Sequence, residues 1–162
     1  MDILEAQGSA SAAKVILIVD DNADDLIFLQ RIMRRHSLVN PVYTLSDGES
    51  AITYLEGRHP YAQRVLFPFP SVLFLDFNLP RKSGLEVLQW LHSRRDLPPL
   101  KIFVYTDITL FPYLQDCYKN GANGFLLKED QEIQFEGLLR DFPDLWQYRY
   151  PEQHSPQKKV VA

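Results

Sequence analysis

The chain contains short, unbroken apolar runs separated by longer segments in which apolar residues recur at helical spacing. Unbroken runs are typical of strands that are buried on both faces of a parallel sheet. Five such runs occupy positions 15–19, 41–45, 72–75, 102–105 and 124–127. The run that begins with Pro41 lacks one amide donor, so we expect it near a sheet edge. The alternation of strand and helix predicts an α/β fold with a doubly wound, five-stranded parallel sheet.

Capping residues indicate where several helices begin. Asn22 can cap a helix whose first turn contains Asp24 and Asp25, and acids in a first turn suit the helix dipole. Two further helices are predicted by serines that precede a glutamate by three positions, as in a capping box; these are Ser46 with Glu49 and Ser83 with Glu86.

Prolines limit the remaining segments. Three prolines between positions 58 and 70 predict a long loop. A helix is expected to run to Asn120 and Gly121, with Pro112 tolerated because it lies in the first turn. A last helix is expected to start near Asp130.

Polar or charged side chains follow four of the five runs at the point where each run ends. They are Asp20 and Asp21, Asp76, Thr106 and Lys128. One such residue could be a surface lysine or a helix cap, but the carboxyl ends of parallel strands line the ligand crevice of an open α/β sheet. The coincidence at one edge of one sheet favours a functional site.

The charges suggest which chemistry this site supports. Converging carboxylates repel one another, and a hard divalent cation relieves that repulsion. A few carboxylates match Mg²⁺, whereas the Cys/His cluster typical of zinc is missing from the sequence. With Mg²⁺ bound, Asp76 could attack a phosphorus centre, and Lys128 and Thr106 could bind the phosphoryl oxygens.

These residues, in this order and strand context, resemble the receiver domain of two-component response regulators over residues 14–142. The resemblance implies a flavodoxin-like (βα)5 fold, a cytoplasmic signalling protein rather than an enzyme, and a histidine kinase as partner. It also implies a role for each site residue: Asp76 as phosphoacceptor, Asp20 and Asp21 as metal-site acids, Asn78 as a main-chain metal ligand, Thr106 as switch hydroxyl, Lys128 as phosphate-pairing cation and Phe125 as switch aromatic.

A narrower resemblance links the chain to stand-alone regulators that are paired with bacterial phytochrome kinases. It is based on the long 58–70 loop, the run from Asp76 to Gly84 and an aromatic segment after Pro143. We expect a disordered lead at 1–13, a receiver at 14–142 and a tail at 143–162 too short for an output domain. Output would then pass through protein contact or phosphotransfer, and the resemblance implies a homodimer.

Composition excludes several other classes. A net charge of −4 gives no electrostatic reason to expect a nucleic-acid partner. No apolar run approaches the ~20 residues of a membrane span, and the acidic N-terminus does not resemble a signal peptide. The single Cys117 fits a reducing compartment.

Two residues depart from the family pattern. Glu129 follows Lys128 where the family usually has proline, and Asp107 follows Thr106 where a small residue is usual. Asp107 could repel an anionic phosphodonor as a gatekeeper, or its side chain could cap the following helix.

Other functions for this fold fit less well. A haloacid-dehalogenase-type phosphatase needs a second acid where Asn78 stands, and a flavodoxin phosphate loop does not suit the acidic segment 20–25. The remaining alternative is a receiver-fold binding module that is never phosphorylated.

Overall fold

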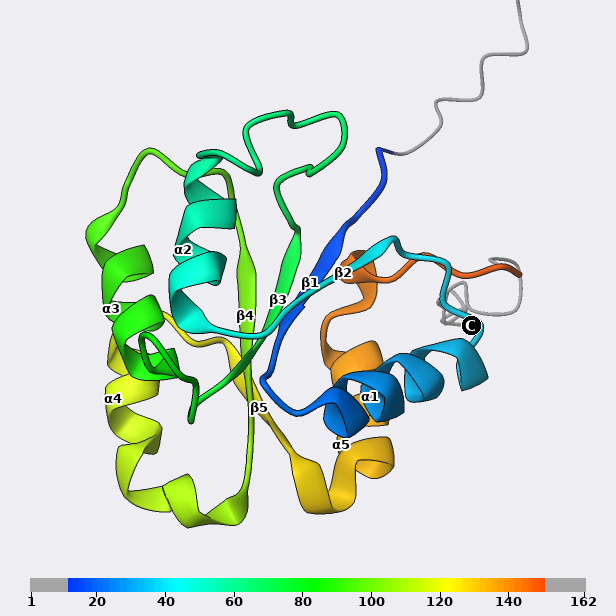
Figure 1. Ribbon diagram of the computed structural model, residues 1–162. Helices are drawn as coiled ribbons and strands as arrows, with labels where there is room; N and C mark the ends of the chain where they lie inside the picture. Colours follow the sequence, from blue (N-terminus) through cyan, green and yellow to red (C-terminus); the bar gives the residue numbers. More distant parts are fainter. Residues whose placement is uncertain (1–11, 151–162) are drawn as a thin grey trace, which may run out of the picture.

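A five-stranded parallel sheet forms the centre of the molecule (Figure 1). The computed structural model describes residues 12–150, except for the side chains of residues 108–110. The strand order is β2-β1-β3-β4-β5. The strands are β1 (Ile16–Val19), β2 (Val42–Leu45), β3 (Val72–Asp76), β4 (Lys101–Thr106) and β5 (Gly124–Leu127). The five predicted strands are confirmed, and β2, which follows Pro41, is an edge strand as expected.

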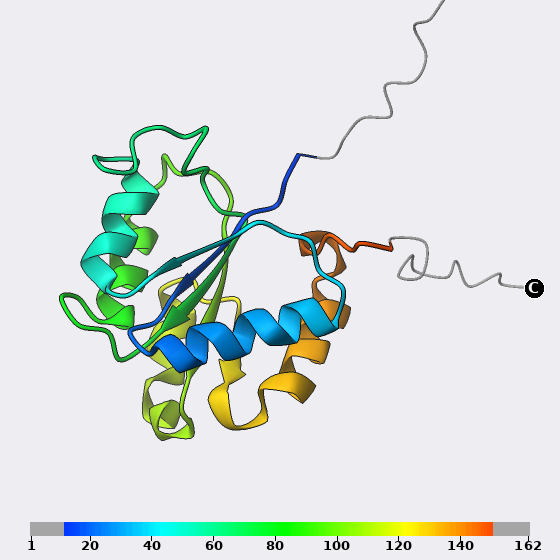
Figure 2. The ribbon, with the colours of Figure 1, turned by 45° about the vertical axis from the view of Figure 1, so that its right-hand side comes forward.

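Helices cover both faces of the sheet (Figures 1 and 2). One face packs against α1 (Ala23–Arg35) and α5 (Gln131–Asp141), and the other packs against α2 (Gly48–Glu56), α3 (Gly84–Ser93) and α4 (Leu114–Lys119). Three 3-10 turns complete the order: η1 (Ile108–Tyr113), η2 (Lys128–Asp130) and η3 (Pro143–Leu145). No helix within residues 12–150 is long and apolar enough to cross a membrane.

Each face has its own apolar core because successive strand residues point to opposite sides. Leu17, Leu73 and Val104 pack towards α2 and α3, whereas Ile18 and Phe74 pack towards α1 and α5. All five side chains are fully buried. Burial on both sides explains why the strands appear in the sequence as unbroken apolar runs.

The helix caps agree with the sequence at two of three positions. Asn22 Oδ1 accepts hydrogen bonds from the amides of α1, and Ser83 with Glu86 forms a complete capping box on α3. The prediction for α2 is wrong by one residue. Asp47, not Ser46, caps this helix, because its carboxylate accepts hydrogen bonds from both the amide (2.7 Å) and the hydroxyl (2.9 Å) of Ser50.

The helix predicted after Thr106 is shorter than expected. Residues 108–113 form the 3-10 turn η1 with Pro112 inside it, and α-helical structure begins at Leu114. Proline lacks an amide and its ring crowds the preceding turn, which disfavours an α-helix through this position.

The 58–70 segment is a long loop, as predicted, and Arg64 holds it against the end of α2. The guanidinium donates hydrogen bonds to the main-chain oxygens of Tyr54 (2.7 Å), Leu55 (2.8 Å) and Phe67 (3.1 Å). The first two bonds bind carbonyls in the last turn of α2, and the third holds the loop at Phe67.

The aromatic segment after Pro143 packs on the sheet. Trp146 is only 5% exposed and stacks on Phe74 and Phe103, with ring centroids 6.4 Å away in each case. Its indole nitrogen donates to the Leu138 carbonyl at 3.2 Å. Chain contacts within the domain therefore continue beyond position 142. Residues 1–11 of the expected lead at 1–13, and residues 151–162 of the expected tail, lie outside the described residues.

Candidate functional site

Three carboxylates lie together at the carboxyl edge of the sheet. Asp76 is the last residue of β3 and Asp20 follows β1, and the two strands pair so that Val19 lies beside Leu75. Ligand oxygens of Asp20, Asp21 and Asp76 lie within 4.8 Å of one another. Asp20 and Asp76 are buried and Asp21 is exposed. The strand ends thus bring together the acids that the sequence singled out.

Lys128 brings a positive charge to these acids from the end of β5. Its ammonium Nζ lies 2.8 Å from Asp20 Oδ2 and 3.5 Å from Asp76 Oδ2. The same ammonium donates a hydrogen bond of 2.8 Å to Asp25 Oδ2 and lies 5.0 Å from the centre of the Tyr105 ring. The Lys128 side chain is 13% exposed, so these contacts are largely shielded from water.

The pKa values reflect burial and the excess of acids. Burial, followed by the charge of Asp20, raises the pKa of Asp76 to about 7, although Lys128 opposes the shift. Burial also raises the pKa of Asp20. Burial lowers the pKa of Lys128, but hydrogen bonds to Asp20 and Asp25 more than offset this and raise it overall. One lysine therefore stays charged but does not neutralise the acids around it.

The loop after Asp76 is tightly packed. Gly84 approaches this loop so closely that a Cβ atom would lie 2.3 Å from the Asp76 carbonyl oxygen, so the position excludes a side chain. Arg81 and Lys82 have positive φ angles of 58° and 148°, which are uncommon for residues other than glycine. Asn78 is exposed, and its main-chain amide donates a hydrogen bond to the Asp76 carboxylate.

Thr106 and Phe125 both line a cavity of about 220 Å³ next to the site. The Thr106 side chain is buried, and within residues 12–150 its Oγ1 has no hydrogen-bond partner. Phe125 is half-buried and meets Tyr118 edge to face, with ring centroids 5.0 Å apart. A buried hydroxyl without a partner is costly, so Thr106 is a candidate to bind an incoming oxygen.

The two residues that depart from the family pattern are both exposed. Asp107 makes no capping hydrogen bond within the part of the chain that the structure describes, so the capping alternative is wrong. Its role as a gatekeeper stays a prediction. Glu129 lies in the turn η2, beside Lys128.

Asp25 is the residue of the site that the sequence did not reveal. Its place in the first turn of α1 is fully explained by the helix dipole. Its contact with Lys128 joins positions 103 residues apart. No periodic spacing in the sequence links these two positions.

The acids fit a hard divalent cation. Two buried carboxylates and one exposed carboxylate converge, and Mg²⁺ is commonly held by a few carboxylates together with waters. The donor atoms are oxygens, so the set suits Mg²⁺ or Mn²⁺ better than a metal that prefers sulfur or imidazole.

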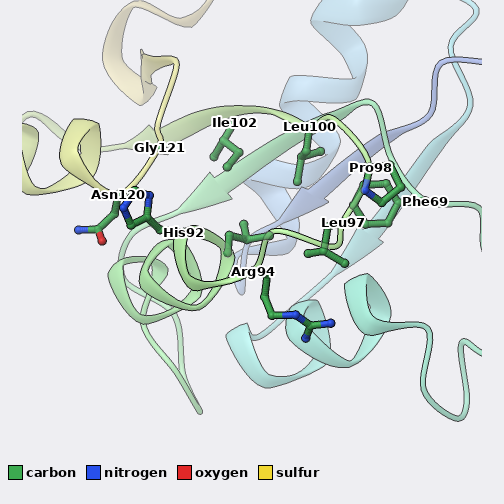
Figure 3. Close-up of a pocket in the computed structure, with 10 residues that line it drawn as sticks. Phe69, His92, Arg94, Leu97, Pro98, Leu100, Ile102, Asn120 and Gly121 are labelled. Carbon is green, nitrogen blue, oxygen red and sulfur yellow. The ribbon is translucent and has the colours of Figure 1, made fainter.

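A second cavity, of about 250 Å³, lies away from these acids (Figure 3). It is lined by residues that include Leu97, Pro98, Asn120 and Gly121, near the ends of α3 and α4. None of the acids or Lys128 lines it. It therefore belongs to the amino edge of the sheet, and not to this site.

The fold and site define a signalling receiver, with acids, a hydroxyl and a lysine at the carboxyl edge of a (βα)5 sheet. The family model for the response regulator receiver domain matches residues 16–139. The chain belongs to this family.

Among similar proteins, "Probable methanogenesis regulatory protein FilR2" of Methanothrix harundinacea is 30% identical over 96% of this chain and 93% of its own length. Response regulator Rcp1 of Synechocystis sp. is 32% identical over 82% of this chain and 88% of its own. The structure of Mn²⁺-bound Rcp1 has a TM-score of 0.69 at 28% identity and covers 78% of this chain and 91% of Rcp1. The structure of phosphorylated RcpA, a cyanobacterial phytochrome response regulator, has a TM-score of 0.69 at 27% identity. The match covers 83% of this chain and 94% of RcpA.

Proposed function

We propose that this response regulator accepts a phosphoryl group on Asp76 from the phosphohistidine of a kinase. The observation that carries the proposal is the position of the buried Asp76 carboxylate, which lies among two other acids and 3.5 Å from the Lys128 ammonium. This arrangement provides a nucleophile, a place for a cation and a fixed positive charge within one small volume.

In the proposed transfer, an Asp76 oxygen attacks phosphorus and forms an acyl phosphate. The bond between phosphorus and the histidine nitrogen breaks, and that nitrogen keeps the electron pair. Lys128 and the Thr106 hydroxyl would hydrogen-bond the phosphoryl oxygens. Thr106 shares a cavity with Phe125 and with Leu114 of α4. A change in the position of Thr106 would therefore be transmitted through this cavity to the surface at α4.

A divalent cation would be held by Asp20, Asp21 and Asp76, with the main-chain carbonyl of Asn78 as a further proposed ligand. When bound, it would supply positive charge against the phosphoryl oxygens. The Mn²⁺ in the Rcp1 structure and the phosphorylation in the RcpA structure support both parts of the proposal by similarity.

The partner that we propose is a histidine kinase of the phytochrome type, by similarity to RcpA. Output would pass through contact with a downstream protein or through phosphotransfer, and the active form would be a homodimer in the cytoplasm. The alternative is a binding module that is never phosphorylated; the unpartnered Thr106 hydroxyl and the acid cluster favour the phosphorylated form.

Labelling by a small phosphodonor tests the proposal. We expect Mg²⁺-dependent label on the native chain and none on Asp76→Asn. Asp116→Asn is the matched control, since Asp116 is exposed and lies outside the acid cluster. Label that persists on Asp76→Asn, or a native chain that takes no label with Mg²⁺, would refute the proposal.

The same assay tests the gatekeeper role of Asp107. Removing a nearby negative charge with Asp107→Asn should speed labelling several-fold at low salt and less at high salt, since salt screens exposed charges. An unchanged rate at low salt would show that Asp107 has no such role.

A further inference from the structure

Lys128 has an acidic partner that belongs neither to the metal-binding acids nor to the predicted site. Asp25, on α1, accepts a hydrogen bond of 2.8 Å from Nζ, which is shorter than the 3.5 Å from Nζ to Asp76. From this difference we infer that Asp25 restrains Lys128 in the unphosphorylated state and that Lys128 must give up this contact, in part or fully, to bind the phosphoryl group. The inference rests on the proposed function and adds a positioning residue to it.

The position of Asp25 sets it apart from the other acids. Asp20 and Asp76 belong to the group that could hold a cation, whereas Asp25 does not. If Asp20 holds a cation, Asp25 is the acid outside that group that would still compete for Lys128. Asp25 is fixed on a helix of 13 residues whose first turn is capped by Asn22. It therefore stays in place while the lysine moves.

The surroundings of the ammonium limit where it can go. The fully buried Tyr105 lies under it at 5.0 Å, and Asp20 and Asp25 each approach it at 2.8 Å. A lysine side chain has a flexible stem and a compact charge, so a small rotation of the stem can exchange one acceptor for another. Lys128 is thus placed to move between Asp25 and a phosphoryl oxygen on Asp76.

Charge acts in the same direction as this competition. Asp20, Asp25 and Asp76 surround one lysine, and an incoming phosphoryl group adds more negative charge. Asp25 therefore opposes phosphoryl binding twice, by holding Lys128 and by repelling the anion. The first effect needs the contact, whereas the second depends only on a charge in this turn of the helix.

Asp24 separates these two effects and provides the matched control. It precedes Asp25 in the same helical turn and carries the same charge, but it is exposed, and within residues 12–150 it forms no ion pair with Lys128. Asp24→Asn and Asp25→Asn therefore change the net charge, and the interaction of that charge with the helix dipole, by the same amount. Only Asp25→Asn weakens the hold on the lysine.

The experiment measures the affinity of the full chain for beryllofluoride, a phosphoryl mimic, by calorimetry in saturating Mg²⁺. A partly exposed ion pair is worth up to about 1 kcal/mol, which corresponds to about fivefold in affinity. We expect Asp25→Asn to bind beryllofluoride about three- to fivefold more tightly than the native chain, and Asp24→Asn less than twofold more tightly. The affinity for Mg²⁺ alone should change equally in both variants. A general loss of structure in one variant would make the two Mg²⁺ affinities differ, so this measurement excludes that explanation.

Each other outcome has a defined meaning. Equal beryllofluoride affinities for the two variants, or weaker binding by Asp25→Asn, would overturn the inference and leave the proposed function intact. A native chain that binds no beryllofluoride in Mg²⁺ would overturn the proposed function, and the inference with it. Asp25→Ser serves as a second variant, because serine suits a helix N-terminus and also lacks the charge.

Discussion

Two ionic clusters in this molecule are built from the same kinds of group, yet they hold their charges differently. At the carboxyl edge of the sheet, Lys128 faces Asp20, Asp25 and Asp76. Beyond the end of α3, Arg94 makes two 2.8 Å hydrogen bonds to Asp96 and one of 3.0 Å to Glu56, and its guanidinium lies over the Trp90 ring.

Their effects on carboxyl groups are opposite. The hydrogen bond from Arg94 lowers the pKa of Asp96 to about 2, whereas burial raises the pKa of Asp76 to about 7. Arg58 also pairs with Glu56, so the Arg94 cluster has two cations for two acids and is electrically neutral. The Lys128 cluster has more acid than base in a buried place. The first arrangement is typical of a structural ion pair, and the second is typical of a site whose excess of acids suits a divalent cation.

Replacing the basic side chain of each cluster should give the largest difference in stability between the two clusters. In metal-free buffer at pH 8, Lys128→Met should lower the free energy of unfolding by about 3 kcal/mol, because it leaves buried carboxylates without a partner. Arg94→Met should cost less, since Asp96 is 64% exposed and water can replace the arginine. Urea unfolding of both variants measures this difference, and equal losses would show that the clusters do not differ as described.

The second prediction concerns the pH dependence of Asp76. Its folded pKa of about 7 lies above the ordinary aspartate value of 3.8, so ionisation costs the native state stability as pH rises from about 4 to about 7. In metal-free buffer, Asp76→Asn should therefore be more stable than the native chain by on the order of 2 kcal/mol at pH 8. The difference should disappear near pH 4. Unfolding curves at several pH values test this, with Asp24→Asn as control; a difference that does not vary with pH would contradict it.

The smallest expected effect belongs to Asp96 and has the opposite sign. Its folded pKa of about 2 lies below the ordinary aspartate value of 3.8, so its ionised form contributes stability above about pH 4, and this contribution is lost as pH falls towards 2. Asp96→Asn should lower the melting temperature slightly at pH 7 and leave it unchanged near pH 2. Because Asp96 is largely exposed, high salt should reduce the effect. A variant that melts at a higher temperature at pH 7 would show that the pair with Arg94 does not stabilise the fold.

Much of the fold and part of the site could be predicted from the sequence, because both depend on local pattern. Buried parallel strands appear as unbroken apolar runs, and residues such as Asp76 and Lys128 follow directly from where those runs end. Thr106 could be placed in the same way. The roles proposed for these residues came from the family resemblance and stay predictions.

What could not be predicted depends on contacts between distant parts of the chain or on competition between similar neighbours. The pair of Asp25 with Lys128 needs α1 and β5 to meet, and the dipole had already explained Asp25. Asp47 and Ser46 are both good caps, and local geometry chose between them. Trp146 was grouped with a tail because no periodic pattern follows Pro143, yet its ring completes one face of the core.

The C-terminal segment also brings the two described ends of the chain together. Gln147 Oε1 accepts a hydrogen bond from the Lys14 amide at 3.0 Å, and Asn40 links the Lys14 and Leu145 carbonyls. Lys14 precedes β1, so this junction lies at the amino edge of the sheet, a strand length of roughly 15 Å from Asp76. A surface tether attached beside Lys14 or Gln147 would therefore leave the molecule at the pole opposite the acids. The acid cluster at the carboxyl edge would stay accessible to a partner while the molecule is held at its amino edge.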